Sequence, residues 1–344
     1  PDARGDDPSP SLNFADAKDL DTAGDAVGLS VTTTGTFAGN YGALALNADG
    51  SYTYTLYTQA QNATAYGAVQ ALDDGEVLTD TFNYTAKNGF GTTSSTTLVV
   101  SVFGTNDTPT VTVDSGNPLG ANDVAYESGM LPAGTQVPPT TTLVQGTFKL
   151  ADADGLDDIK SVSINGTAID IASLGANNVI VGANGILTVM GYNSTTGVAT
   201  YTYQLTSPTA DGPGTETNVF TLTTSDGTVS SAPVTITIEI TDDMPVAADD
   251  GNRATVSENA IGVNIGTVAG LLANDNFGAD GQGTPNITIA TGSMGGTVVI
   301  SGGNLLYTSA TNVAVDTPET FVYTIKDGDG DTSTATFSVT VTDS

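Results

Sequence analysis

Acidic side chains gather in short loops along this 344-residue chain, and their type and spacing could support metal-ion chemistry. The densest group is the loop 152–158, where four aspartates surround a glycine. An Asn-Asp pair at 106–107 and an Asp-Asp pair at 242–243 each end two residues before a proline. Carboxylate and carbonyl oxygens are the ligands that Ca²⁺ prefers, and a bound cation relieves the repulsion between like charges. The pattern therefore predicts calcium sites.

The pairs at 106–107 and 242–243 coincide with the ends of strand-like runs, where one module would pass into the next. We predict an interdomain calcium site at each pair, completed by an acidic residue from the start of the following module. Glu127 is the expected completing residue at the first pair and Glu258 at the second. The alternative at each place is a solvated turn before proline, because Asp can cap its own turn without a metal.

The other acidic loops leave more than one interpretation open. The loop 152–158 begins like an EF-hand, but Ser163 stands where that motif requires Glu, so a different kind of calcium loop competes with a solvated loop. A looser N-terminal cluster contains Lys18, which can offset the charge instead of a metal. The turn 327–331 fits either a tight hairpin or a single surface ion. The predicted metal ligands are Asn106, Asp107, Glu127, Asp152, Asp154, Asp157, Asp158, Asp242, Asp243, Glu258, Asp16, Asp21, Asp327, Asp329 and Asp331.

The composition excludes several classes of protein. Seven Lys and Arg residues stand against 38 Asp and Glu, and the formal net charge of -31 would repel nucleic acid and anionic membranes. The chain has no Cys and no His, which excludes disulfides, thiolate zinc sites and Ser-His-Asp hydrolases. A glycosidase built on two carboxylates is disfavoured, because the acidic pairs lie in Gly-flanked turns where water would solvate them. We therefore expect that the chain is not an enzyme.

The elements that must position these loops are predicted to be β-strands. The segments 51–56, 199–205 and 234–240 alternate Thr or another polar residue with Tyr, Val, Ile or Leu, the period of a strand with one buried face. Asn-Gly and Asp-Gly turns separate such strands, and helical periodicity is confined to 60–72. Many short strands and 41 Gly residues predict antiparallel β-sandwiches.

The number of modules is predicted from a sequence feature that recurs along the chain. An acidic ending closes a strand-like run three times, and an aromatic strand with an Asn-Gly or Asp-Gly turn precedes each ending. A period near a hundred residues favours tandem globular domains over a solenoid. We predict a linker at 1–11 and domains at 12–107, 108–243 and 244–344. Since the chain begins at Pro1 without a signal peptide or transmembrane stretch, we expect a fragment of a longer protein with no membrane insertion.

Each predicted domain resembles a known repeat family. The segments YGALALNADGSYTYTL at 41–56 and ALDDGEVLTDTFNYTAKNGFGT at 71–92 resemble a VCBS repeat. The segments GTFKLADADGLDDIKSVSING at 146–166 and GYNSTTGVATYTYQL at 191–205 resemble the repeat of type I secretion targets. The segment FVYTIKDGDGDTSTATFSVTVTD at 321–343 is similar to bacterial cadherin-like repeats. The resemblance implies Ig-like or cadherin-like β-sandwiches arranged end to end.

These families occur together in giant RTX-type adhesins of Gram-negative bacteria. The resemblance implies a calcium-stabilised extender that holds ligand-binding domains away from the cell for attachment and biofilm formation. It also implies type I secretion and an extracellular location tethered to the cell surface. The expected partners are neighbouring domains of the same monomeric chain, with host or biofilm ligands bound by other domains. The alternative is that a module of this chain itself binds a sugar or a peptide.

Overall fold

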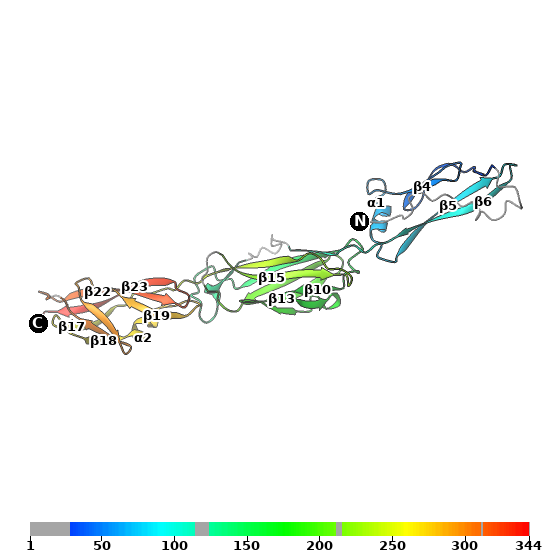
Figure 1. Cartoon of the computed structure of the whole chain (residues 1–344). Helices are drawn as coiled ribbons and strands as arrows, with labels where there is room; N and C mark the ends of the chain where they lie inside the picture. Colours follow the sequence, from blue (N-terminus) through cyan, green and yellow to red (C-terminus); the bar gives the residue numbers. More distant parts are fainter. Residues whose placement is uncertain (1–27, 114–123, 211–214, 311, 344) are drawn as a thin grey trace.

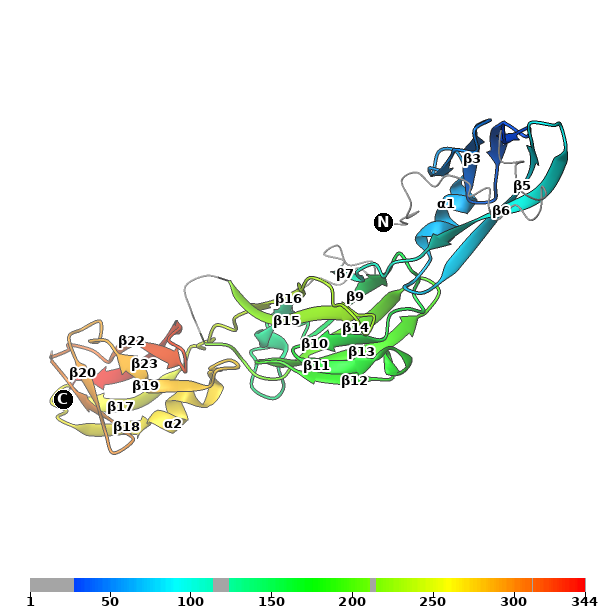
Figure 2. The ribbon, with the colours of Figure 1, turned by 45° about the vertical axis from the view of Figure 1, so that its right-hand side comes forward.

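The computed structural model describes residues 28–113, 124–210, 215–310 and 312–343. Within these ranges the chain forms β-sandwich units that follow one another along an elongated molecule (Figure 1). We call them the first unit (30–103), the second unit (110–241) and the third unit (246–342). The same succession is visible after the molecule is turned (Figure 2). The predicted all-β fold of tandem sandwiches is confirmed, and the exact boundaries at 107/108 and 243/244 stay a prediction.

The first unit packs two three-stranded sheets, ordered β1-β5-β6 and β2-β3-β4, around Leu44, Phe82 and Tyr84. The predicted strand 51–56 is β4, and the predicted helical segment 60–72 contains the helix α1. That helix begins after Asn62, whose side chain accepts a hydrogen bond from the Ala65 N–H. The elements are β1 (Ser30–Val31), β2 (Gly35–Ala38), β3 (Gly42–Leu46), β4 (Tyr52–Leu56), α1 (Ala63–Gln70), β5 (Val77–Lys87) and β6 (Thr93–Phe103).

The second unit packs two five-stranded sheets, ordered β11-β10-β15-β16-β8 and β12-β13-β14-β9-β7. The alternation in 199–205 and 234–240 forms β14 and β16, and the inward residues Tyr203 and Ile238 are fully buried. The elements are β7 (Thr110–Val113), β8 (Val124–Tyr126), η1 (Glu127–Gly129), β9 (Leu143–Ala151), β10 (Ser161–Ile164), β11 (Thr167–Asp170), η2 (Ile171–Ser173), β12 (Asn178–Val181), β13 (Gly185–Asn193), β14 (Val198–Leu205), β15 (Glu216–Ser225) and β16 (Val234–Thr241).

The third unit packs sheets ordered β17-β23-β22-β19 and β18-β21-β20 around Phe321, Tyr323 and Phe337. The Phe321 and Phe337 rings stack with centroids 5.1 Å apart. No helix in the described part of the chain is long and apolar enough to cross a membrane. The elements are β17 (Asn252–Ser257), β18 (Val263–Thr267), α2 (Val268–Leu271), η3 (Leu272–Asn274), β19 (Gln282–Ile289), β20 (Thr297–Ser301), β21 (Asn304–Thr308), β22 (Thr317–Asp327) and β23 (Thr332–Thr342).

Two strand pairs depart from the predicted antiparallel pattern. β8 runs parallel to β16, with Ala125 opposite Ile240, and β17 runs parallel to β23, with Val256 opposite Val341. A hairpin cannot join parallel strands, so the chain crosses the whole unit between the two members of each pair. In the second and third units, an early strand and the last strand therefore both point toward the C-terminal end of the unit.

The three units share a buried polar contact that holds a tight turn between two strands. In the first unit, the Asp80 carboxylate is fully buried and accepts hydrogen bonds from the Asn40, Tyr41 and Gly42 N–H groups at 2.6, 3.0 and 3.3 Å. It also accepts a hydrogen bond from the Tyr54 hydroxyl at 2.6 Å. A buried carboxylate is tolerated here because each oxygen accepts at least one hydrogen bond.

Asn218 and Glu319 occupy the corresponding places in the second and third units. Asn218 accepts from the Ala183 N–H at 3.3 Å and donates to the Tyr203 hydroxyl at 3.0 Å. Glu319 accepts from the Tyr307 hydroxyl at 2.7 Å and from two backbone N–H groups of the turn before β20. In every unit the tyrosine packs edge-on against a phenylalanine two residues after the buried group, with centroids 5.9–6.2 Å apart. The three units thus share one arrangement of a buried polar group, a tyrosine and a phenylalanine.

Candidate cation sites at the two junctions

The first junction, between the first and second units, gathers carboxylates from both. Asp73 comes from the loop between α1 and β5, and it lies with Asp154 and Asp158 from the loop after β9. An overlapping group joins Asp152 and Asp158 to Asp226, which lies in the turn between β15 and β16. Within each group, one ligand oxygen per residue lies within 4.8 Å of the others. This closeness is unfavourable for ionised carboxylates without a cation between them.

Hydrogen bonds hold residues 106–107, which connect the first unit to the second, against these loops. The Asp107 N–H donates to Asp154 Oδ2 at 2.6 Å, and the Asn106 side-chain amide donates to Asp226 Oδ2 at 3.0 Å. The other Asp226 oxygen accepts from the Thr228 N–H at 2.6 Å, an Asx turn that holds this carboxylate in place. Asp107 therefore does lie beside the loop 152–158, where its N–H holds the Asp154 carboxylate, while Asn106 holds the carboxylate of Asp226 in the turn after β15.

Several oxygens at the first junction are buried without a hydrogen-bond partner. They are Asp152 Oδ2, Asp154 Oδ1 and Asp158 Oδ2. Burial raises the pKa of Asp152 to about 6, and repulsion from Asp154 and Asp158 adds to the effect. Burial also raises the pKa of Asp154. Lys160 offsets only part of the charge, because its ammonium lies 3.3 Å from Asp158 on a side chain that is 56% exposed.

The second junction, between the second and third units, has the same character. Glu127, directly after β8, lies with Asp242, directly after β16, and with Asp280 from the loop before β19. Their ligand oxygens lie within 4.8 Å of one another. Glu127 is fully buried, and its Oε1 accepts from the Thr209 N–H at 2.6 Å and the Thr209 hydroxyl at 2.8 Å. Its Oε2 is buried with no hydrogen-bond partner.

The turn 327–331 lies beside this group and adds further negative charge to it. The pKa of Asp242 is raised to about 8. Burial is the largest cause, and a contact with Asp331 and repulsion from Asp329 and Glu127 raise the pKa further. Burial raises the pKa of Asp280 to about 7, and repulsion from Glu127 and Asp329 adds to it. Further unpartnered buried oxygens at this junction are Asp242 Oδ1, Asp280 Oδ2, Asp327 Oδ2 and both carboxylate oxygens of Asp329.

The residues present fit a hard divalent cation. Every donor in these groups is a carboxylate oxygen, the ligand type that Ca²⁺ takes in flexible arrangements of six to eight. Soft or imidazole-binding metals are disfavoured, because the sequence has no Cys or His. The unpartnered buried oxygens would gain their missing interactions from such an ion.

Two predicted pairings were wrong. Glu127 does not lie with Asn106 and Asp107, because the parallel strand β8 carries the chain to the opposite end of the second unit. Glu258 does not lie with Asp242 for the same reason, since β17 carries it to the far end of the third unit. There the Glu258 carboxylate accepts from the Val313 N–H at 2.9 Å.

Some other predicted ligands have different surroundings. Asp243 is buried and its carboxylate accepts from the Thr135 N–H at 2.7 Å, from the Thr135 hydroxyl and from the Ala279 N–H at 3.1 Å. It therefore bridges the second and third units by hydrogen bonds. Asp157 belongs to neither group at the first junction, although its carbonyl accepts from Lys160. Asp16 and Asp21 lie outside the described residues.

Sequence reasoning missed two members of the first junction and left one member of the second unassigned. Asp73 carries no signal beyond its Asp-Asp-Gly turn, and its approach to Asp154 depends on how the units meet. Asp226 could have been found, because Asp226-Gly227 and Asp327-Gly328 follow equivalent strands, and only the second turn was selected. Asp280 lies in the loop before β19, and its approach to Glu127 depends on how the second and third units meet.

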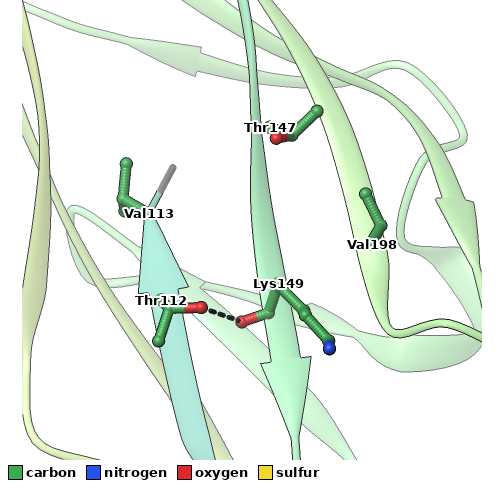
Figure 3. Close-up of a pocket in the computed structure, with 5 residues that line it drawn as sticks. All are labelled: Thr112, Val113, Thr147, Lys149 and Val198. Atoms are coloured by element: carbon green, nitrogen blue, oxygen red, sulfur yellow. Dashed lines mark hydrogen bonds between the residues drawn. The ribbon is translucent and has the colours of Figure 1, made fainter. Parts of the chain in front are cut away.

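A shallow cavity lies apart from the acidic groups, on the sheet face formed by β7, β9 and β14. It has a volume of about 260 Å³, and Figure 3 shows the residues that line it, with the Thr112 hydroxyl donating to the Lys149 carbonyl at 3.4 Å. Its lining residues are Thr112, Val113, Thr147, Lys149 and Val198. The lining of this cavity contains neither an aromatic ring nor a carboxylate.

Comparisons with solved structures found multidomain cadherins at low similarity. Protocadherin gamma-B7, extracellular cadherin domains 3–6, aligns over 94% of this chain and 66% of its own with 14% identity and a TM-score of 0.37. Mouse cadherin-23, extracellular cadherin domains 22–24, aligns over 95% of this chain and 89% of its own with 16% identity and a TM-score of 0.37. The present chain thus spans just under two thirds of the first of these. Comparison with curated proteins gave no match.

A family model gives the more specific result. The model described as a bacterial Ig domain matches residues 242–340, which include the acidic pair 242–243 and all but the last two residues of the third unit. The match begins at Asp242, where the second junction begins in the structure. The chain is therefore a tandem array of Ig-like β-sandwiches whose third unit is similar to the bacterial Ig domain.

Proposed function

We propose that this chain is a calcium-stabilised extender segment of a bacterial surface adhesin. The observation that carries the proposal is that both junctions assemble their carboxylates from different units. At the first junction Asp73 meets Asp154, and at the second junction Glu127 meets Asp280. A cation held by such a group contacts two units at once, so binding it fixes their relative orientation.

The buried charge explains why the metal would matter. Without a cation, carboxylates of neighbouring units repel across each junction, and several of their oxygens have no hydrogen-bond partner. The chain would then behave as a loosely jointed series of units. With Ca²⁺ bound, the same carboxylates become ligands, and a series of units becomes a stiff spacer suited to holding a binding domain away from a surface.

The proposed location follows from the affinity expected of such sites. Extracellular calcium modules have dissociation constants on the order of 0.1–1 mM, so the junctions would stay metal-free in a cytosol and fill outside the cell. At a hundred times its dissociation constant, an ion adds about 2.7 kcal/mol to the stability of the form that binds it. Secretion by a type I system, membership of an RTX-type adhesin and a role in biofilms are supported by the resemblance of the three segments to families found there.

The test compares two neighbouring aspartates in the first unit. Asp73 belongs to a junction group, whereas Asp74 is exposed and belongs to none of the groups found among the described residues. We expect Asp73→Asn to weaken calcium binding at one site at least about tenfold, as loss of a ligand does. Asp74→Asn removes the same charge and should leave binding unchanged. Calorimetric titration with Ca²⁺ measures both.

Small-angle scattering tests the mechanical consequence. The wild-type chain should become longer and stiffer between chelator and millimolar Ca²⁺, and Asp74→Asn should behave in the same way. Asp73→Asn should keep a flexible first junction at calcium concentrations that stiffen the wild type. If the wild-type chain binds no Ca²⁺, or if its scattering is identical with and without the ion, the proposed function is wrong.

A further inference from the structure

The inner face of β6 is less well covered than the equivalent face in the second unit. Leu98 on β6 lies opposite Phe82, and Ile236 on β16 lies opposite Phe220 in the same way. Ile236 is 1% exposed, whereas Leu98 and the next inward residue, Val100, are only partly buried. Part of the core of the first unit is therefore accessible from one side.

The strand β4 shows the same difference. Tyr52 corresponds to Tyr201 on β14, because each lies two residues before the tyrosine that contacts the shared buried polar group. Tyr201 is 3% exposed, whereas Tyr52 is only partly buried. We call Tyr52, Leu98 and Val100 the open side of the first unit.

The strand orders indicate what covers this side in the other units. β4 and β6 are each the last strand of their sheet among the described residues. In the second unit the equivalent strands continue into further neighbours, since β14 pairs with β9 and β16 pairs with β8. Helix α1 replaces part of this cover, because Val69 and Leu72 pack with Val102 at the end of the first unit that is nearer to the second (Figure 1). The open side is the part that α1 does not reach.

The chain order shows where a strand equivalent to β9 would come from. Val31 of β1 lies opposite Ala86, and Val162 of β10 lies opposite Thr224, in each case four positions after the shared phenylalanine. β1 is therefore equivalent to β10. Since β9 directly precedes β10, its counterpart must precede β1, in the part of the chain before residue 28 that lies outside the described residues.

The sequence before residue 28 contains a match to the end of β9 and its acidic loop. FADAKDLD at 14–21 aligns without gaps to LADADGLD at 150–157. The identical positions in the first of these segments are Ala15, Asp16, Ala17, Leu20 and Asp21.

The alignment also matches the apolar residues of β9. Phe148 and Leu150 are fully buried in the core of the second unit. Leu12 and Phe14 stand at these two positions in the aligned segment. Apolar residues two apart are what a strand needs to cover one face of a sandwich.

We propose that residues 11–15 of this chain dock along the outer edge of β4, antiparallel to it as β9 is to β14, and cover the open side with Leu12 and Phe14. The docked segment is short, because Pro8 and Pro10 cannot donate to a strand ladder. A short segment is sufficient, since α1 already covers the rest of this side.

Docking should not require a cation, so this inference is separate from the proposed function. In the alignment Lys18 stands at the position of Asp154. Asn88, in the turn after β5, stands at the position of Asp226, in the turn after β15. This end of the first unit thus carries fewer carboxylates than the first junction, and the tests below are made in chelator.

Hydrogen exchange read by mass spectrometry on the full chain tests the cover. Leu12→Ser and Phe14→Ser should each speed exchange in peptides of β4 and β6 at least about tenfold, because an apolar side chain that closes the core is lost. Asn13→Ser is the matched control, since Lys149 at the equivalent position of β9 is exposed, and it should exchange like the wild type. The inference is overturned if Leu12→Ser and Phe14→Ser also exchange like the wild type.

A disulfide tests the register without relying on stability. Thr147 of β9 lies opposite Thr200 of β14, and the equivalent pair in the first unit is Ser11 and Ser51. Because the chain has no Cys, the double variant Ser11→Cys with Ser51→Cys should form a disulfide within one chain under mild oxidation. Ser9→Cys with Ser51→Cys lies two residues out of register, about 7 Å along the strand, and should cross-link at least about tenfold more slowly.

The two pairs separate the possible occupants of this edge. Equal cross-linking from Ser9→Cys and Ser11→Cys would mean that the segment does not dock in this register, and it would overturn the inference. A disulfide that joins two chains instead of closing within one would assign the edge to a second copy and overturn it as well. Both results leave the proposed extender function standing, because neither depends on calcium binding.

Discussion

Replacing Asp80 with Ala tests the buried contact that the three units share. The substitution leaves the N–H groups of residues 40, 41 and 42 and the Tyr54 hydroxyl without their acceptor. Hydrogen bonds to a charged group contribute about 1.5–3 kcal/mol each and do not add fully, so we expect the first unit to lose about 3–5 kcal/mol. A loss of this size is a large part of the stability of a small domain.

The second unit indicates which substitution should be tolerated. Asn218 occupies the equivalent position there, donating to a tyrosine hydroxyl and accepting from a backbone N–H. Asp80→Asn can adopt the same arrangement toward Tyr54, so its cost should be about 1–2 kcal/mol. Thr79→Ala, on the exposed face of the same strand, should change stability by no more than about 0.5 kcal/mol.

Hydrogen exchange read by mass spectrometry on peptides of β3 and β5 reports the opening free energy of the first unit inside the intact chain. The three variants should rank Asp80→Ala, Asp80→Asn and Thr79→Ala in decreasing cost. If Asp80→Ala costs no more than Thr79→Ala, the carboxylate does not hold the hairpin. If Asp80→Asn costs as much as Asp80→Ala, the equivalence with Asn218 is wrong.

Two further predictions concern the junction charges. Burial raises the pKa of Asp242 to about 8 and that of Asp280 to about 7, both above the ordinary value near 4 in an unfolded chain. Protonation of these two carboxyl groups therefore stabilises the folded state of the junction. This stability is present below about pH 4 and is lost as pH rises through 7 and 8. Without metal, the melting temperature should fall as pH rises from about 4 to 8, and saturating Ca²⁺ should flatten the fall; a flat metal-free profile would contradict these shifts. Lys160→Met removes the ammonium that lies 3.3 Å from Asp158, so calcium should bind the first junction about two- to threefold more tightly in a calorimetric titration. Unchanged or weaker binding would mean that Lys160 does not compete with the ion.

The sequence was sufficient for the features that depend on neighbouring residues. Alternation along 199–205 and 234–240 predicted strands, because successive side chains of a strand point to opposite faces. The acidic loop at 152–158 and the turn at 327–331 were found for a similar reason, since a cluster within one loop can be read along the chain. The absence of Cys and His by itself restricts the candidate metal ligands to oxygen atoms.

Only the tertiary structure decided which carboxylates meet. Glu127 lies near Asp107 in the sequence, yet it joins Asp242, because β8 runs parallel to the last strand and carries it across the unit. Asp73 joins Asp154 because two separately folded units meet end to end. Local patterns specify strands and loops through interactions between residues close in sequence. The pairing of distant carboxylates depends on strand direction and on the contact between units, and neither is encoded in the spacing of the residues themselves.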